Sequence, residues 1–125
     1  MNTIYFTPIS LSQLLKEKGV KQVSEYYHQK ITQDEWKLTH VSEFNGINKA
    51  GQIEVSGAEQ LRSYAEDGDD AYSAFTLSEL PDVFRQVFGE ENIYKIQQEW
   101  RMFCMQYLRD PKTAWETLEK TIKEL

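Results

Sequence analysis

The chain has 125 residues, of which 40% are hydrophobic and 13% aromatic, so we expect one globular domain spanning residues 1–125 and no wholesale disorder. No apolar run approaches the roughly 20 residues that cross a bilayer, and the N-terminus lacks the features of a signal peptide, so we expect no membrane contact and a cytoplasmic location. The formal net charge of -6 argues against direct nucleic-acid binding, which needs a basic face for the phosphates.

The first third of the chain carries short signals for both strand and helix. Alternation over residues 2–7 predicts a short strand. Ser10 and Gln13 have the spacing of a capping box, and the helix that begins there should end at Gly19. A second short helix is expected next, from the spacing of four apolar residues: Val20, Val23, Tyr26 and Tyr27.

Residues 32–56 allow two interpretations, and both stay open. Thr32 and Glu35 have the spacing of a helix start. Residues 37–44 also fit a strand that pairs with residues 52–56 across the loop 46–51. The stretch is therefore either helix or hairpin, and it supplies any minor β element of the fold.

The C-terminal half predicts three consecutive helices. Apolar residues recur at helical spacing from Ser78 to Phe88, where Gly89 can end the helix. The longest apolar stripe follows over residues 90–108, and the pair Asp110 and Pro111 begins a final helix. The predicted fold class is mainly α, and α+β at most: a compact helical domain with three consecutive C-terminal helices and a minor β element in its N-terminal half.

No common catalytic signature occurs in the sequence: it lacks G-x-S-x-G, a Walker phosphate loop, G-x-G-x-x-G and H-E-x-x-H. Cys104 falls within the longest apolar stripe, so we expect a buried core thiol. His28 and His40 are expected at the surface or at an edge, without metal-ligand spacing. His40 and Glu43 have the spacing of one ligand pair in helical bundles, which is too little for a site. We expect no enzyme, no cofactor and no metal.

The negative charge is concentrated in the middle of the chain. Residues 1–40 carry five basic and four acidic residues, residues 41–92 carry three and eleven, and residues 93–125 carry six and five, which gives +1, -8 and +1. Five of the eleven acids fall in the first turns of predicted helices, where they complement the helix dipole. Glu43 and Glu54 lie in the ambiguous stretch, and four acids remain as a cluster: Glu66, Asp67, Asp69 and Asp70.

This acidic cluster suggests a binding surface for a protein with a basic face. An EF-hand reading fails, because Tyr72 stands where that loop requires Gly and Ser78 where it requires Glu. Carboxylates beside tyrosines suit a basic partner, although a plain solvated turn with core tyrosines explains the same residues. The candidate partner-binding residues are Glu66, Asp67, Asp69, Asp70, Tyr64 and Tyr72.

Two functions follow from these patterns. The first is a small acidic, non-enzymatic protein-binding protein, such as an inhibitor, an immunity protein or an anti-defence protein, that engages a basic partner surface. The alternative is a structural subunit of a homo-oligomer or of a larger assembly of the phage or mobile-element type. It is suggested by Tyr94, Met102 and Met105, which lie off the main stripe of the central helix.

Overall fold

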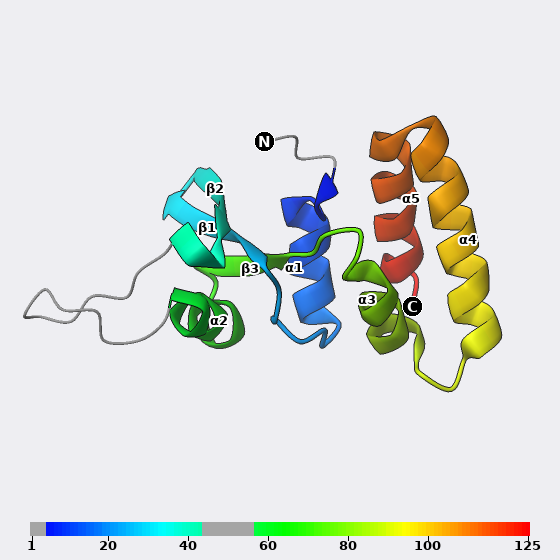
Figure 1. Cartoon of the computed structure of the whole chain (residues 1–125), viewed down its shortest axis with the longest axis horizontal. Helices are drawn as coiled ribbons and strands as arrows, with labels where there is room; N and C mark the ends of the chain where they lie inside the picture. Colours follow the sequence, from blue (N-terminus) through cyan, green and yellow to red (C-terminus); the bar gives the residue numbers. More distant parts are fainter. Residues whose placement is uncertain (1–4, 44–56) are drawn as a thin grey trace, which may run out of the picture. The chain divides into compact units, whose positions relative to one another are not determined.

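The computed structural model describes residues 5–43 and 57–125, which form an α+β fold (Figure 1). None of the helices in this described part is long and apolar enough to cross a membrane. In chain order the elements are α1 (Ile9–Glu17), β1 (Tyr26–Thr32), β2 (Glu35–His40), the 3-10 helix η2 (Val41–Glu43), α2 (Gly57–Asp67), β3 (Ala71–Ala74), α3 (Leu80–Phe88), α4 (Ile93–Arg109) and α5 (Pro111–Lys123).

The chain divides into two compact units. The helical unit comprises Met1–Val20 and Thr76–Leu125, and it contains α1, α3, α4 and α5. The sheet unit comprises Lys21–Phe75, with the three strands and α2. The three consecutive C-terminal helices are confirmed, and so is a small β element, although its third strand, β3, lies beyond the N-terminal half in which it was expected. That one domain spans residues 1–125 stays a prediction.

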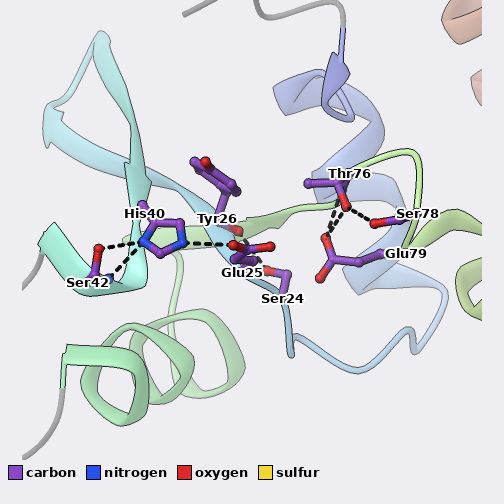
Figure 2. A network of polar contacts seen from close by, with 8 residues as sticks. All are labelled: Ser24, Glu25, Tyr26, His40, Ser42, Thr76, Ser78 and Glu79. Atoms are coloured by element: carbon purple, nitrogen blue, oxygen red, sulfur yellow. Dashed lines mark hydrogen bonds and ion pairs between the residues drawn. The ribbon is translucent and has the colours of Figure 1, made fainter.

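Helix α3 ends at the predicted Gly89 but begins at Leu80, two residues after the predicted Ser78. The Glu79 carboxylate accepts hydrogen bonds from the backbone N–H of Thr76 at 2.8 Å and from its hydroxyl at 3.0 Å, the carboxylate half of a capping box (Figure 2). Pro81 stands in the first turn, where its missing N–H costs little. Gly89 ends the helix with a φ of 91°, a backbone conformation that favours glycine.

An aromatic cluster forms the core between α3, α4 and α5. α4 and α5 run antiparallel side by side, joined at Asp110 (Figure 1). Phe103 on α4 is buried, and its ring lies 5.0 Å from that of Trp115 and 6.1 Å from that of Phe84, measured between centroids. Such aromatic pairs add to the free energy of burial, so this cluster is the main apolar anchor of the helical unit.

The N-terminal helix α1 is confirmed, but its predicted cap is wrong. Pro8 precedes the first turn, and the Ser10 hydroxyl donates instead to the Glu119 carboxylate at 2.6 Å. Gly19 follows the helix with a φ of 89°, as its position predicts. The strand expected over residues 2–7 is represented in the described residues by a single bridge between Phe6 and Thr76.

The sheet unit overturns the helix expected over Val20 to Tyr27. Tyr26 begins β1, which pairs antiparallel with β2 on one side and with β3 on the other. Thr32 and Glu35 face each other across the turn of the β1–β2 hairpin, so the helix start predicted there is wrong as well. Residues 37–40 are strand, as one of the two interpretations expected, but they pair with β1; the expected partner, residues 52–56, lies outside the described residues.

The core of the sheet unit is small and partly polar. Tyr27 packs with Leu61 and Ala65 of α2 and with Ala71 of β3. Gln22 is also buried, and its side-chain oxygen accepts the backbone N–H of Ser73 at 2.9 Å. The Tyr27 hydroxyl donates to the backbone carbonyl of Gln22 at 2.8 Å. Polar bonds from one irregular segment therefore tie the first and third strands together.

Candidate partner-binding surfaces

The four clustered acids lie where α2 ends and β3 begins. Glu66 and Asp67 form the last turn of α2, and Asp69 and Asp70 occupy the bend before β3. All four side chains are exposed. A short helix-to-strand connection thus gathers four carboxylates, and we call them the acidic surface.

Three of these carboxylates have neighbours within the unit. Glu66 accepts from the Arg62 guanidinium at 3.2 Å, one helical turn earlier, and Asp67 accepts from the Ser63 hydroxyl at 3.3 Å. Asp69 accepts from the Tyr72 hydroxyl at 3.2 Å. Because these contacts are exposed to water, they hold the carboxylates in place without cancelling their field.

The two candidate tyrosines differ in exposure. Tyr64 is 39% exposed on α2 and lines a hollow of about 590 Å³ together with Asp70 and β1 residues that include Lys30. Tyr72 is only 9% exposed, and its ring packs against that of Trp36 at 5.6 Å. Burial, and then the nearby Asp69, raise the pKa of Tyr72. Tyr64 is therefore available to a partner, whereas Tyr72 positions Asp69.

The two units carry very different charges. The sheet unit has five Lys or Arg and ten Asp or Glu along its sequence, which gives -5, and the helical unit has nine and ten, which gives -1. Their sum is the formal -6 of the whole chain. Nearly all of the excess negative charge therefore belongs to the unit that carries the acidic surface.

A second surface lies on α4. Tyr94 is 89% exposed and Leu108 is 86% exposed, and Met102 and Met105 are also exposed. Met105 and Leu108 line one hollow, and exposed apolar side chains that gather in this way mark a candidate interaction surface. The exposure of Tyr94, Met102 and Met105 agrees with the sequence prediction that α4 is apolar on more than one side, whereas Leu108, at the end of the predicted apolar stripe, is exposed rather than buried.

Cys104 lies at this α4 surface rather than in the core. It is half-buried, and it lines a hollow of about 460 Å³ with Trp100, Met105 and other α4 residues. Burial raises the pKa of the Cys104 thiol. The thiol is therefore neutral at pH 7, which is the wrong state for a nucleophile, and its expected place in the core is corrected.

Glu25, His40 and Ser42 form a polar network (Figure 2). The His40 Nε2 lies 2.9 Å from the Glu25 carboxylate, and the Nδ1 lies 2.6 Å from the Ser42 hydroxyl. A carboxylate, a histidine and a serine in this order resemble the catalytic triad of a hydrolase. However, Nδ1 also accepts the backbone N–H of Ser42 at 3.1 Å, and the Glu25 side chain is 59% exposed. These contacts link the residue before β1 to the end of β2, at the open end of the hairpin, and do not align a nucleophile.

Neither histidine has the surroundings of a metal ligand in the described part of the chain, where no group of three potential ligands occurs. His40 contacts Glu25 and Ser42, and no contact joins it to Glu43. His28 is buried at the middle of β1, opposite Leu38 and Tyr72, so the surface position expected for it is wrong.

Comparison of the chain with protein-family models, with curated proteins and with solved structures finds no match. The two surfaces are therefore the features from which a function can be proposed.

Proposed function

We propose that the chain is a small, non-enzymatic protein-binding protein whose acidic surface engages a basic face of another protein, as an inhibitor, an immunity protein or an anti-defence protein does. The observation that carries this proposal is the charge of the sheet unit, -5 over 55 residues, together with the gathering of four exposed carboxylates at one helix-to-strand connection. A field of this sign steers a basic partner toward the surface and raises its rate of association.

Tyr64 supplies the apolar part of this contact. Its ring lies at the hollow that Asp70 also lines, so a Lys or Arg side chain entering there meets both an aromatic face and a carboxylate. Aromatic residues are enriched among those that carry binding energy, whereas exposed charges chiefly set the rate of association and its salt dependence.

The test is partner capture with a matched control for charge. The test variant neutralises the acidic surface (Glu66→Gln, Asp67→Asn, Asp69→Asn, Asp70→Asn). The control neutralises four exposed acids of the helical unit (Glu90→Gln, Glu91→Gln, Glu116→Gln, Glu124→Gln). Each protein is cross-linked in an extract of its source cells at low and at high salt, and the captured proteins are quantified by mass spectrometry.

We expect the wild type and the control to capture a basic protein at low salt, and the acidic-surface variant to lose at least about tenfold of that signal. Tyr64→Ala should weaken the same complex without changing its salt dependence. Failure to capture any basic protein, or equal capture by both four-residue variants, contradicts the proposal.

A second candidate function, a subunit of a homo-oligomer or larger assembly, is favoured by the exposed apolar side of α4. Tyr94, Met105 and Leu108 are each more than half exposed on one helix. Sedimentation at high protein concentration tests self-assembly directly. A strict monomer counts against a homo-oligomer, and a dimer that Leu108→Ser disperses supports one.

A further inference from the structure

The exposed side of α4 repeats at the spacing with which helices pack. Five exposed residues follow one another at steps of four, three, four and three along α4. Alternation of these two steps places side chains along one line of a helix, so that a second helix can lie against them. We call this line the α4 seam, and it consists of Tyr94, Gln98, Arg101, Met105 and Leu108.

The α4 seam contains a cation and no carboxylate, and the exposed Asp110 follows Arg109 at the end of the helix. Arg101 is the middle member of the seam, and Arg109 follows its last member. Within residues 5–43 and 57–125, neither arginine makes an ion pair. Glu99, the one acid in the α4 sequence, has a side chain that is only 13% exposed and pairs with Lys95 at 3.1 Å. Two free guanidinium groups therefore border an apolar surface.

A second copy of the chain is a poor occupant of this seam. Parallel helices in register bring Arg101 against Arg101, because identical seam positions face each other. Antiparallel helices centred on the seam do the same, because Arg101 is the third of five members. Like charges that face each other across an interface cost about several kcal/mol of binding free energy, which is enough to exclude a partner. Shifted registers avoid this contact only by leaving Tyr94 or Leu108 without a partner.

We propose that the α4 seam binds a helix of another protein, one that presents apolar residues along the seam and carboxylates opposite Arg101 and Arg109. The inference rests on the second candidate function, that α4 is an assembly face, and names its partner. It is independent of the acidic surface. A guanidinium donates two parallel hydrogen bonds to a carboxylate. Arg101 therefore selects an acidic helix and also fixes the register in which that helix binds.

The hollow on α4 gives the incoming helix an apolar anchor point. Trp100, Cys104, Met105 and Leu108 line it, and Arg101 lies at the same place. Methionine side chains adapt their shape to a partner, which suits a surface that receives a Leu or Ile from a second helix. One face of a 17-residue helix is a small interface, so we expect a dissociation constant on the order of 10 µM.

The test uses two synthetic amphipathic helical peptides of about 18 residues. Both carry Leu at the same heptad positions, and the positions beside each Leu hold Glu in one peptide and Gln in the other. Each peptide is labelled and titrated with the full chain by fluorescence anisotropy at low salt. We expect the Glu-flanked peptide to bind at least about tenfold more tightly than the Gln-flanked peptide. Arg101→Glu should abolish that preference, and Leu108→Ser should weaken both peptides.

Two controls keep the outcomes distinct. Lys112→Glu makes the same change of charge at an exposed site of α5, and it should leave the preference intact. The variant with a neutralised acidic surface should bind both peptides as the wild type does. Equal binding of the two peptides would overturn the proposal of an acidic partner, while α4 would remain an assembly face. A dimer that Leu108→Ser disperses would have the same two consequences. A monomer that binds neither peptide overturns the assembly face itself, without touching the proposal for the acidic surface.

Discussion

The helical unit and the sheet unit are built on opposite balances of apolar packing and charge. The helical unit holds a cluster of large aromatic rings around the buried Phe103, has a net charge near zero and exposes the α4 seam. The sheet unit has a small core of one tyrosine with leucine and alanine, several buried polar bonds and a net charge of -5. The comparison teaches that one short chain offers two chemically different binding surfaces, and that each unit should respond to a different kind of substitution.

The largest expected effect is loss of the aromatic core. Phe103→Ala removes the ring that contacts Phe84 and Trp115, and it should destabilise the helical unit by about 3–5 kcal/mol. Denaturant unfolding followed by tryptophan fluorescence gives the magnitude. Tyr94→Ala, on the same helix but 89% exposed, should stay within about 0.5 kcal/mol of the wild type.

Hydrogen exchange on the Phe103→Ala variant then tests the comparison itself. If amides of β1 keep their protection while those of α4 lose it, the two units unfold separately. If both lose protection together, the chain unfolds as the one domain that its length predicts, and the division into units describes contacts but not stability.

The sheet unit should be more sensitive to a polar change. Gln22→Met keeps the size of the side chain but removes the oxygen that accepts the Ser73 N–H, and a buried unsatisfied donor costs about 1–3 kcal/mol. The denaturation midpoint and the exchange rate of the Ser73 amide measure the effect. Gln13→Met, at an exposed site of α1, should be close to neutral. An equal loss of stability in both variants would show that the buried hydrogen bond of Gln22 does not stabilise this core.

Alkaline pH should also distinguish Tyr27 from an exposed tyrosine. Burial raises the pKa of Tyr27 above its usual value of about 10, so the folded state holds the phenolic proton more tightly than the unfolded state does. The stability this provides is present below pH 10 and is lost as the pH rises through the raised pKa. Tyr27→Phe should cost about 1 kcal/mol at pH 7 through its lost hydrogen bond, and should flatten the loss of stability above about pH 10. Tyr94→Phe should follow the wild-type profile.

The smallest effect is expected at the exposed start of α5. The Thr113 hydroxyl donates to the Asp110 carboxylate at 2.6 Å, and this hydrogen bond lowers the pKa of Asp110. Its contribution is therefore present above the unfolded pKa and is lost as the pH falls through the lowered one. Asp110→Asn should reduce the melting temperature by about 2 °C at pH 7 and by less near pH 2. A difference of the same size at both values of pH would assign the effect to shape rather than to charge.

The C-terminal helices could be predicted because each of their signals is local. The apolar residues of α3 recur one helical turn apart, Gly89 follows them directly, and Pro111 marks the start of α5. Each signal lies within a few residues of the element that it defines, so no distant contact is needed to interpret it. The same holds for the exposure of Tyr94 and Met105, which follows from their angular position on one helix.

The sheet unit was harder to predict because its signals are distant from one another. The β1–β2 turn, Gln33 and Asp34, lacks the glycine that marks most two-residue hairpins, and an irregularity between Lys30 and Thr32 takes up the mismatch. Val23, Tyr26 and Tyr27 also happen to fit helical spacing, although valine and tyrosine favour strands. Nothing near Gln22 indicates its bond to a residue 51 positions away.

The acidic surface could be located but not described from the sequence. The four carboxylates are neighbours along the chain, so their exposure at one turn was expected. The burial of Tyr72 depends on Trp36, which reaches it from another strand, and so its role could not be read locally. The α4 seam could not be predicted from charge alone, because the value of Arg101 and Arg109 depends on their place on an exposed helix face.

The side chain of Gln22 affects which edge of the sheet is open to pairing with another strand. In the described sheet β3 lies at one edge, and an uncovered edge strand is a template on which a second molecule can add a strand. Gln22 occupies the N–H of Ser73, one of the groups that such a strand would bond. A glutamine from the loop before β1 therefore satisfies one edge N–H of β3, a strand whose four residues are all buried, whereas β2, the opposite edge of the described sheet, is partly exposed and is the edge on which another strand can add.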